Sequence, residues 1–271
     1  MKKKYIYEAE VLENQEIAPH MRKMVIGSRE AAEEAQPGQF INIYPKADRL
    51  ILPRPISICD ADPARGSLTI VYDVIGAGTR ELSEMVRGDL IRISSPLGNG
   101  FRMPAAPGNP VLLISGGVGT APMVFLAKRL REQGSRITAV TGFRKDAILT
   151  EELRQEDCRV LVTTELPSEH AFVGNVVDCM EVNQLDIDET WTCYACGPRP
   201  MLEAVARFLE NISDRTELQV SLEARMGCGY GACVGCAVDI RESSPDKAEE
   251  IITRKKVCKD GPVFDGKAVV W

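Results

Sequence analysis

Four cysteines near the C-terminus have the residue type and spacing of a metal-cluster site. Cys228, Cys233 and Cys236 follow the pattern C-x4-C-x2-C, and Cys258 follows after twenty-one further residues. This is the plant-type pattern in which each iron of a [2Fe–2S] cluster takes two thiolates. Structural zinc is the alternative, but zinc sites usually pair two short Cys-x2–4-Cys segments. One compact loop with one distant cysteine favours an iron–sulfur cluster, which transfers single electrons.

Glycines surround the first three of these cysteines, at positions 227, 229, 231 and 235. Glycine tolerates unusual φ values and lets the backbone come close to a bound group. Backbone amides in such a loop can point at sulfur, as clusters require. The segment is therefore expected to wrap around the cluster.

The composition excludes several classes of protein. The 271 residues suggest about two domains. A net charge of −6 disfavours a nucleic-acid-binding protein, because no basic excess exists to neutralise phosphates. The sequence contains no run of about eighteen apolar residues, so no membrane span is predicted. The nine cysteines are odd in number, and five are dispersed outside the cluster set, which favours reduced thiols in the cytoplasm.

The first hundred residues have the alternating pattern of antiparallel strands, separated by turn signals such as Pro37-Gly38 and Gly88-Asp89. This pattern predicts a barrel or a sandwich. One short helix is expected over Thr79–Val86 with Thr79 as its N-cap, and residues 104–110 read as a linker. The predicted strands are Tyr5–Leu12, Met21–Ile26, Gln39–Tyr44, Ile56–Cys59, Ser67–Asp73 and Leu90–Ser94.

From Val111 onward, strands alternate with helices, which predicts an open parallel α/β sheet. The remaining residues, from about 220 to 271, are too few for a core of their own, so metal ligation is expected to help hold them together. The predicted strands of the sheet are Val111–Ser115, Ile137–Gly142, Val160–Thr164 and Trp191–Ala195, and the predicted helices are Pro122–Gln133 and Arg199–Glu210.

A glycine-rich loop joins the first of these strands to its helix. Gly116, Gly117 and Gly119 are followed by Thr120 and, at the helix start, Pro122. Glycines allow close approach to a pyrophosphate, and the helix N-terminus offers free N–H groups to it. The loop therefore predicts a nucleotide site, and the alternative is a tight turn without a ligand.

Two further segments have phosphate-binding chemistry, and one has a cysteine pair. Arg54 in the segment Arg54-Pro55-Ile56-Ser57 could clamp a phosphate with two donors. The segment Gly76-Ala77-Gly78-Thr79 opens the short helix and offers a second phosphate-binding helix start. The alternative for either segment alone is a turn without a ligand. Cys193 and Cys196 form C-x-x-C, which could suggest a redox disulfide. That interpretation is disfavoured, because Cys193 lies within a strand pattern and Cys196 at its end.

Together these motifs resemble the ferredoxin–NADP reductase superfamily over essentially the whole chain. Its members bind a flavin through Arg-Pro-x-Ser and a nicotinamide nucleotide through Gly-Gly-x-Gly-x-x-Pro and Cys-Gly-Pro. The appended cluster segment is similar to the electron-transfer subunits of NAD-linked (type B) dihydroorotate dehydrogenases. In related subunits of ferredoxin-linked transhydrogenases an aspartate replaces the first cluster cysteine, and here that residue is Cys228.

The resemblance implies three domains: an FAD-binding β-barrel over residues 1–103, an NAD-binding α/β domain over 108–218 and a [2Fe–2S] domain over 219–271. Gly116, Gly117, Gly119 and Thr120 would lie along NAD, and Cys196 would act near the nicotinamide and flavin rings. The FAD contacts it implies, partly through backbone atoms, are Arg54, Pro55, Ile56, Ser57, Val71, Tyr72, Asp73, Gly78 and Thr79.

The implied function is electron transfer. A nicotinamide carries two electrons as a hydride, whereas a cluster carries one electron at a time. A flavin can exchange either, so FAD is expected between them. The resemblance implies an FMN-containing partner subunit that oxidises dihydroorotate to orotate in pyrimidine biosynthesis, in a heterotetramer that reduces NAD+. The alternatives are a stand-alone or ferredoxin-linked NAD(P)H reductase component and a redox-sensing module. Arg144 and Lys145 could read the 2′-phosphate of NADP or could be solvated turn charges.

Overall fold

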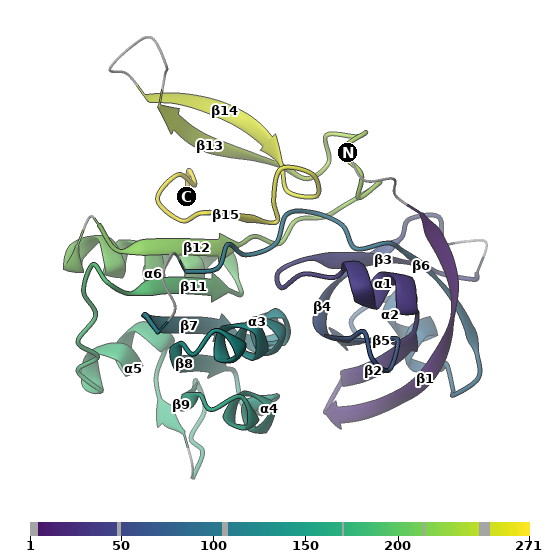
Figure 1. Ribbon diagram of the computed structural model, residues 1–271, viewed down its shortest axis with the longest axis horizontal. Coiled ribbons are helices and arrows are strands. Elements are labelled where there is room, and N and C mark those ends of the chain that lie inside the picture. The colour runs from purple at the N-terminus through teal and green to yellow at the C-terminus, as the bar shows by residue number, and fades with distance from the viewer. Residues whose placement is uncertain (1–4, 48–49, 105–107, 170, 214, 244–249) are drawn as a thin grey trace.

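The computed structural model describes residues 5–47, 50–104, 108–169, 171–213, 215–243 and 250–271. A β-barrel stands beside an α/β sheet, and a smaller C-terminal layer lies above them (Figure 1). Of the expected linker, residues 105–107 lie outside the described residues. Within the described ranges, no helix is both long and apolar enough to cross a membrane.

The barrel closes from six antiparallel strands in the order β1-β2-β5-β4-β3-β6, which confirms the expected antiparallel barrel. Alternate side chains such as Ile26, Ile58 and Ile93 are fully buried in its interior, as the two-residue period of a strand requires. The first strand is longer than the sequence predicts, because pairing with β2 continues to Ala18. The strands are β1 Ile6–Ala18, β2 Met21–Gly27, β3 Phe40–Tyr44, β4 Arg54–Asp62, β5 Ser67–Asp73 and β6 Leu90–Ser94.

The helix expected over Thr79–Val86 starts and ends earlier in the structure. Helix α2 spans Ala77–Ser83 and its N-cap is Gly76. The Thr79 hydroxyl accepts the N–H of Gly76 at 3.2 Å from within the first turn. The prediction of Thr79 as the N-cap is therefore wrong, because its side chain caps the helix from inside.

The barrel also has a helix that the sequence analysis does not predict, α1 at Arg29–Glu34. It begins where the Ser28 side chain accepts the N–H of Ala31. Ala31 and Ala32 are buried in the barrel core. A six-residue helix is too short for a periodic apolar pattern to be visible, so its capping serine is the main signal in the sequence.

The second lobe is a seven-stranded sheet in the order β10-β9-β8-β7-β11-β12-β15. Its neighbours pair in parallel except β15, which is antiparallel to β12. The expected parallel α/β sheet is confirmed, with an added antiparallel edge strand. The strands are β7 Pro110–Gly116, β8 Arg136–Phe143, β9 Arg159–Thr164, β10 Phe172–Val173, β11 Thr192–Cys196, β12 Glu217–Ser221 and β15 Val263–Asp265.

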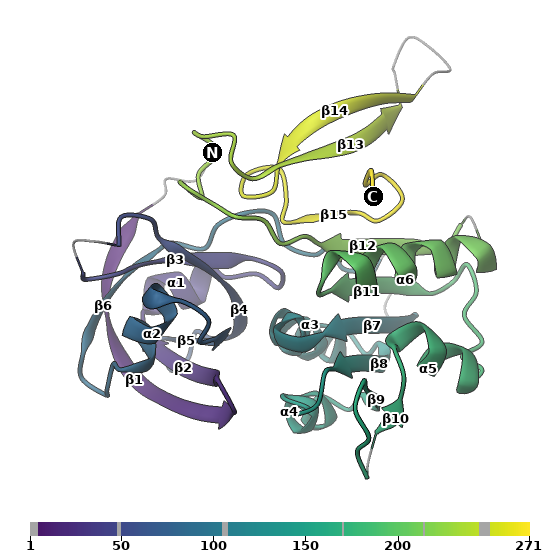
Figure 2. The same cartoon turned by 180° about the vertical axis from the view of Figure 1, so that it is seen from behind.

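Helices cover both faces of this sheet (Figures 1 and 2). The helices α3 and α4 pack into one apolar core, and α5 and α6 pack into another on the opposite face. A 3-10 turn, η1, joins β7 to α3. The bounds are η1 Gly117–Thr120, α3 Ala121–Glu132, α4 Thr150–Gln155, α5 Val176–Val182 and α6 Arg199–Ile212.

The C-terminal segment has no separate core. Its hairpin, β13 Ala237–Ser243 and β14 Glu250–Lys256, rises from the molecule (Figure 2). Val238 and Ile240 at the base of the hairpin belong to the same apolar core as Val220 of the sheet. The strand β12 crosses the expected boundary between residues 218 and 219. Metal ligation is therefore not all that holds the segment, because it shares the core of the sheet.

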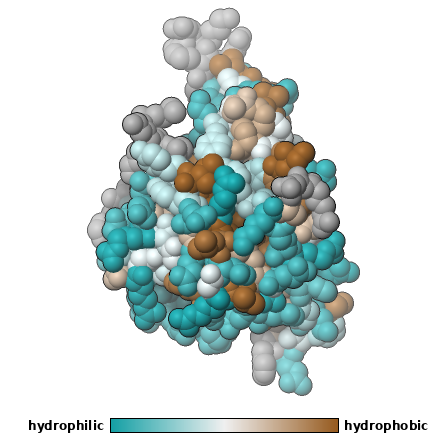
Figure 3. Space-filling model, turned by 90° about the vertical axis from the view of Figure 1, so that its right-hand side faces the viewer, coloured by the Kyte–Doolittle hydropathy of each residue, from teal (hydrophilic) through white to brown (hydrophobic). Residues whose placement is uncertain are grey.

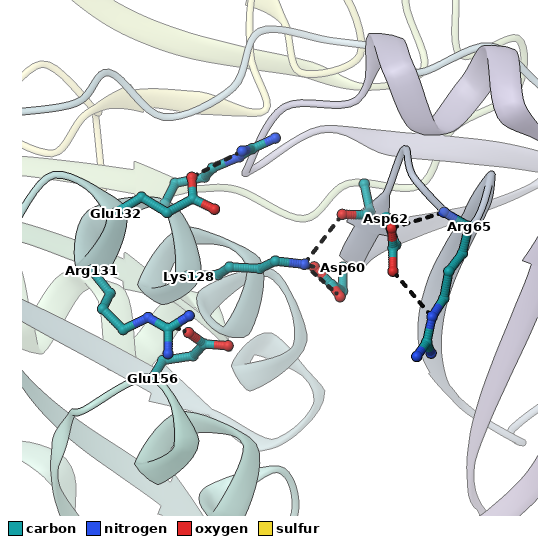
Figure 4. A network of polar contacts seen from close by, with 9 residues as sticks. Asp60, Asp62, Arg65, Lys128, Arg131, Glu132 and Glu156 are labelled. Carbon is teal, nitrogen blue, oxygen red and sulfur yellow. Dashed lines mark hydrogen bonds and ion pairs between the residues drawn. The ribbon is translucent and has the colours of Figure 1, made fainter.

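The barrel and the sheet meet along α3. Phe125 of α3 is fully buried within the barrel core. Lys128, one turn further along, donates to both carboxylate oxygens of Asp60 on β4, at 2.8 and 3.1 Å (Figure 4). A second ion pair joins Lys23 to Glu152 at 3.1 Å. The first contacts fix the barrel against α3, which begins at the glycine loop, and the Lys23–Glu152 pair fixes it against α4.

Candidate functional site

A cavity of about 450 Å³ lies between the barrel and the sheet. Every residue for which the sequence predicts a flavin contact lines this cavity. Gly119 and Cys196, which the sequence assigns to the nucleotide side, line it as well. The cavity lining contributed by the predicted flavin segments is Arg54, Pro55, Ile56, Ser57, Val71, Tyr72, Asp73, Gly78 and Thr79.

Arg54 reaches the cavity because residue 78 has no side chain. A Cβ at Gly78 would lie 2.1 Å from Nε of Arg54. The guanidinium therefore occupies the space that a larger residue would fill, and one of its nitrogens donates to the Leu52 carbonyl at 2.6 Å. Its other N–H groups can serve a phosphate, for which the planar guanidinium is suited.

The strand β5 presents its backbone to the cavity. Val71 and Tyr72 are each 1% exposed, and their side chains pack in two different apolar cores. The Tyr72 hydroxyl donates to Asn14 within the barrel. The side chains of Val71 and Tyr72 are therefore held in the apolar cores, although both residues line the cavity.

The glycine loop is built for close packing as well as for a ligand. A Cβ at Gly119 would lie 2.5 Å from the Cys196 carbonyl, and one at Gly116 would lie 2.7 Å from Sδ of Met201. Gly117 has φ +55 and open space around it. Thr120 is buried, and its hydroxyl lies 2.9 Å from that of Ser115. Of the predicted nucleotide residues, only Gly119 reaches the cavity; Gly116, Gly117 and Thr120 do not line it.

The register of the sheet brings this loop beside Cys196. Ser115 at the end of β7 pairs with Cys196 of β11, which pairs with Ser221 of β12. From β7 the chain adds β8, β9 and β10 on one side, and it then adds β11 and β12 on the other side. The direction of strand addition therefore reverses between β7 and β11. Ligands bind outside the carboxyl ends of parallel strands at such a switch point.

The Cys196 side chain is held as a neutral thiol. Burial, with a smaller contribution from the nearby Glu223 carboxylate, raises its pKa to about 12, although a hydrogen bond with Ser221 opposes the shift. Glu223 itself lines the cavity, and burial raises the pKa of its carboxyl. A polarisable, uncharged thiol at this wall suits contact with apolar rings.

The sequence analysis did not identify several residues of the cavity wall. Apart from Phe40, Ile75 and Pro262, they lie at the end of β12 and in the segment that leads from it into the cluster loop. The signal available in the sequence was their position directly before Cys228. The lining residues that lie outside the predicted motifs are Phe40, Ile75, Ser221, Leu222, Glu223, Ala224, Met226 and Pro262.

The four cluster cysteines form two pairs in the structure. Sγ of Cys228 lies 3.5 Å from Sγ of Cys233, and Sγ of Cys236 lies 3.3 Å from Sγ of Cys258. Among the described residues, no three His, Cys, Asp or Glu side chains converge as a single metal site. Two pairs of thiols match a cluster in which each iron takes two thiolates.

Backbone amides surround the first cluster cysteine. Sγ of Cys228 accepts the N–H groups of Tyr230 and Cys233, each at 3.4 Å. Burial raises the pKa of this thiol, but these amides, the Cys233 thiol and the Ala232 amide together outweigh burial and lower the pKa to about 6. Gly229 and Gly231, with φ +74 and +81, supply the left-handed backbone of the loop. The donor set therefore fits a [2Fe–2S] cluster.

The other five cysteines are all buried and unpaired. Cys193 and Cys196 belong to apolar cores on opposite faces of the sheet. The two sulfurs therefore point away from each other across β11, in agreement with the interpretation that they form no redox disulfide.

Comparisons with known proteins identify the C-terminal segment. Residues 223–270 match the iron–sulfur cluster binding domain of dihydroorotate dehydrogenase B. The chain is 38% identical to the dihydroorotate dehydrogenase B (NAD(+)) electron transfer subunit of Bacillus caldolyticus, with 94% of each chain covered. The same subunit from Caldanaerobacter subterraneus is 38% identical, with 97% of this chain and 98% of the relative covered.

Solved structures agree on the fold. A chain of the NADH-dependent reduced ferredoxin–NADP oxidoreductase superposes with a TM-score of 0.82 at 30% identity, over 97% of this chain and 90% of that one. A ferredoxin NADP+ reductase from Neisseria gonorrhoeae superposes with a TM-score of 0.61 at 16% identity, over 77% and 92% of the two chains, and shares the fold alone. With relatives this similar along nearly their whole length, the chain belongs to the family of electron transfer subunits of dihydroorotate dehydrogenase B.

Proposed function

We propose that this chain is the electron transfer subunit of an NAD-linked dihydroorotate dehydrogenase. Its relatives have that name, and the cofactors the family uses are FAD, a [2Fe–2S] cluster and NAD. When bound, a flavin exchanges a hydride with a nicotinamide and single electrons with a cluster. The chain's own residues bind, orient and shield these groups.

The observation that supports this proposal best is the segment 221–228. Its first residues line the cavity with Arg54 and Cys196, and Met226 of the same wall lies two residues before Cys228. The cavity and the cluster loop are thus consecutive parts of one stretch of chain. A short path for electrons requires this proximity of two redox groups.

The geometry supports the following proposal for the residue roles. Arg54 would hold the flavin phosphates, the backbone of Val71–Asp73 would bind the flavin ring system, and Gly78 and Thr79 would complete the cradle. Gly116, Gly117, Gly119 and Thr120 would bind the nicotinamide nucleotide beside the Cys196 thiol. We assign FAD binding to residues 1–103, NAD binding to 108–218 and the cluster to 219–271, with Cys228, Cys233, Cys236 and Cys258 as ligands.

A subunit that transfers electrons requires a catalytic partner. We propose that the partner contains FMN, oxidises dihydroorotate to orotate in pyrimidine biosynthesis, and assembles with this chain as a heterotetramer in the cytoplasm. The free state of the nine cysteines is compatible with that compartment. Arg144 and Lys145 are exposed at the end of β8. We propose that they are solvated turn charges and that the substrate is NAD+.

The test is reconstitution with the partner. The partner alone should oxidise dihydroorotate with an artificial acceptor but should not reduce NAD+, and adding this chain should restore NAD+ reduction. Cys228→Ser should remove the iron and the NAD+ activity while FAD remains bound. Cys158→Ala, at a buried cysteine in a different part of the fold, should retain both. Full NAD+ reduction by the partner alone would contradict the proposal.

The second candidate is a stand-alone or ferredoxin-linked NAD(P)H reductase component. It is supported by the similarity to the NADH-dependent reduced ferredoxin–NADP oxidoreductase. Such a component would reduce a ferredoxin with NADH in the absence of any FMN-containing subunit. Rapid turnover of that kind, with no response to the dihydroorotate-oxidising partner, would favour it.

A further inference from the structure

Strand β3 of the barrel contacts the cluster loop at two alternate positions. Asn42 donates its side-chain N–H to the Cys228 carbonyl at 3.1 Å. The Tyr44 hydroxyl lies 2.7 Å from the hydroxyl of Tyr230. Residues two apart lie on the same face of a strand, and the residues they contact on the loop are also two apart. The barrel therefore holds the loop at its first cluster cysteine with two side chains.

Asn42 is unusually placed for a polar residue. It is 0% exposed, and its backbone N–H donates to Oγ of Ser94 on β6 at 2.9 Å. Its Oδ1 has no hydrogen-bond partner among the described residues. Buried polar atoms are normally paired, and an unpaired one is costly. A buried amide in this environment points to a role for its N–H, which reaches Cys228.

The Asn42 side chain also packs against the peptide that follows Cys228. A Cβ at Gly229 would lie 2.3 Å from Nδ2 of Asn42. The next residues, Tyr230 and Cys233, donate their N–H groups to Sγ of Cys228. Asn42 thus fixes the start of the segment from which these amides reach the sulfur, and Tyr44 fixes its middle.

We infer that Asn42 and Tyr44 are positioning residues that align the amides on the Cys228 sulfur and thereby set the reduction potential of the cluster. Hydrogen bonds to the sulfurs are among the factors that determine such potentials. The inference rests on the proposed cluster site. It assigns to the flavin-binding barrel, through β3, an influence on a redox centre held by another part of the chain.

The test uses the purified chain with its cofactors, prepared without oxygen. Asn42→Leu removes the amide at similar volume, so the barrel should persist. We expect a lower midpoint potential in an EPR-monitored redox titration, because weaker N–H···S bonds stabilise the added electron less. We also expect roughly fivefold faster loss of the visible absorbance to an iron chelator, as for the loss of one buried hydrogen bond.

The matched control is Asn183→Ala. The Asn183 amide also donates to a cysteine carbonyl, that of Cys179 at 2.8 Å, but in α5. This variant should keep the wild-type potential and chelation rate. If Asn42→Leu does not fold, Tyr44→Phe is the test variant, and we expect it to lower the midpoint potential of the cluster as well.

The outcomes separate the two claims. A wild-type potential and EPR spectrum in Asn42→Leu, with the cluster present, would overturn the inference and leave the proposed function intact. If Asn42→Leu does not fold, a wild-type cluster potential in Tyr44→Phe would also overturn the inference. A wild-type protein without an iron cluster would overturn both.

Discussion

The cysteines differ in the pKa of their thiols, because burial and hydrogen bonding differ from one cysteine to the next. Hydrogen bonds outweigh burial at Cys228 and lower its pKa to about 6. Burial raises the pKa of Cys59, Cys193 and Cys196 to about 12. The low pKa therefore distinguishes Cys228, the first cluster cysteine, from the inert thiols of the apolar cores, whereas the pKa of Cys258 is also raised to about 12, mainly by burial.

This difference predicts selective alkylation. A thiol with a pKa raised to about 12 is almost wholly protonated at pH 8, and only the thiolate reacts. We expect Cys59, Cys193 and Cys196 to resist iodoacetamide at pH 8 in the folded protein and to react in denaturant, where the pKa returns to about 8.5. Peptide mass spectrometry measures this. Rapid labelling of native Cys196 would contradict the assigned burial.

A second prediction at this scale concerns Gly78. In Gly78→Ala the new Cβ would displace the Arg54 guanidinium, because it would lie 2.1 Å from Nε. We expect FAD affinity to fall about tenfold to a hundredfold, the effect of losing a charged hydrogen bond. The control is Gly27→Ala, where the nearest atom would be at 3.5 Å. Fluorescence titration measures the FAD affinity of both variants. An FAD affinity of Gly78→Ala equal to that of Gly27→Ala would contradict the role of Gly78 in placing Arg54.

At the scale of elements, the sequence predicts the middles of strands well and their ends poorly. The strands Ser67–Asp73 and Leu90–Ser94 are found with the predicted bounds. Period-two alternation marks residues that face a core, but a strand continues as long as its neighbour pairs with it, as β1 does to Ala18. The predicted start of α2 is wrong because a threonine can cap a helix from the third helical position as well as from the N-cap position.

The contact between α3 and β4 leads to a third prediction. The Lys128 and Asp60 side chains are 26% and 33% exposed, so their ion pair is screened by solvent. We expect Lys128→Asp to lower the free energy of unfolding by about 1 kcal/mol. The exchanged pair, Lys128→Asp with Asp60→Lys, should restore most of it. Urea denaturation measures both, and no recovery in the double variant would show that the pair itself contributes nothing.

For the molecule as a whole, the C-terminal segment and the sheet act as one body. The strand β15 pairs with β12, and the residues around the cluster cysteines share the core with Val220 and Leu218. On the barrel-side face the surface is mainly hydrophilic, with small separate apolar groups (Figure 3). Leu218 and Val220 of the sheet are thus covered by the cluster segment.

This shared core gives a fourth prediction. Deleting residues 223–271 would expose Val220 and Leu218, at about 1.5–3 kcal/mol for each large apolar side chain that loses its burial. We expect the truncated chain to aggregate, whereas removing the iron from the full chain should leave the sheet covered and folded. Size-exclusion chromatography and circular dichroism measure this. A monomeric, cooperatively melting truncation would contradict the shared core.

Local sequence patterns are enough to predict the chemistry. The cysteine spacing, the glycine loop and the Arg54 segment each indicate a ligand, because the donors of a loop lie within a few residues of one another. The order of barrel, sheet and cluster segment is also predictable from the sequence. The folded structure was needed to show that Glu223 and Phe40 share a cavity with Arg54, and that Asn42 reaches Cys228. Those contacts join residues far apart in the chain, and sheet register and packing, which no local pattern encodes, bring them together.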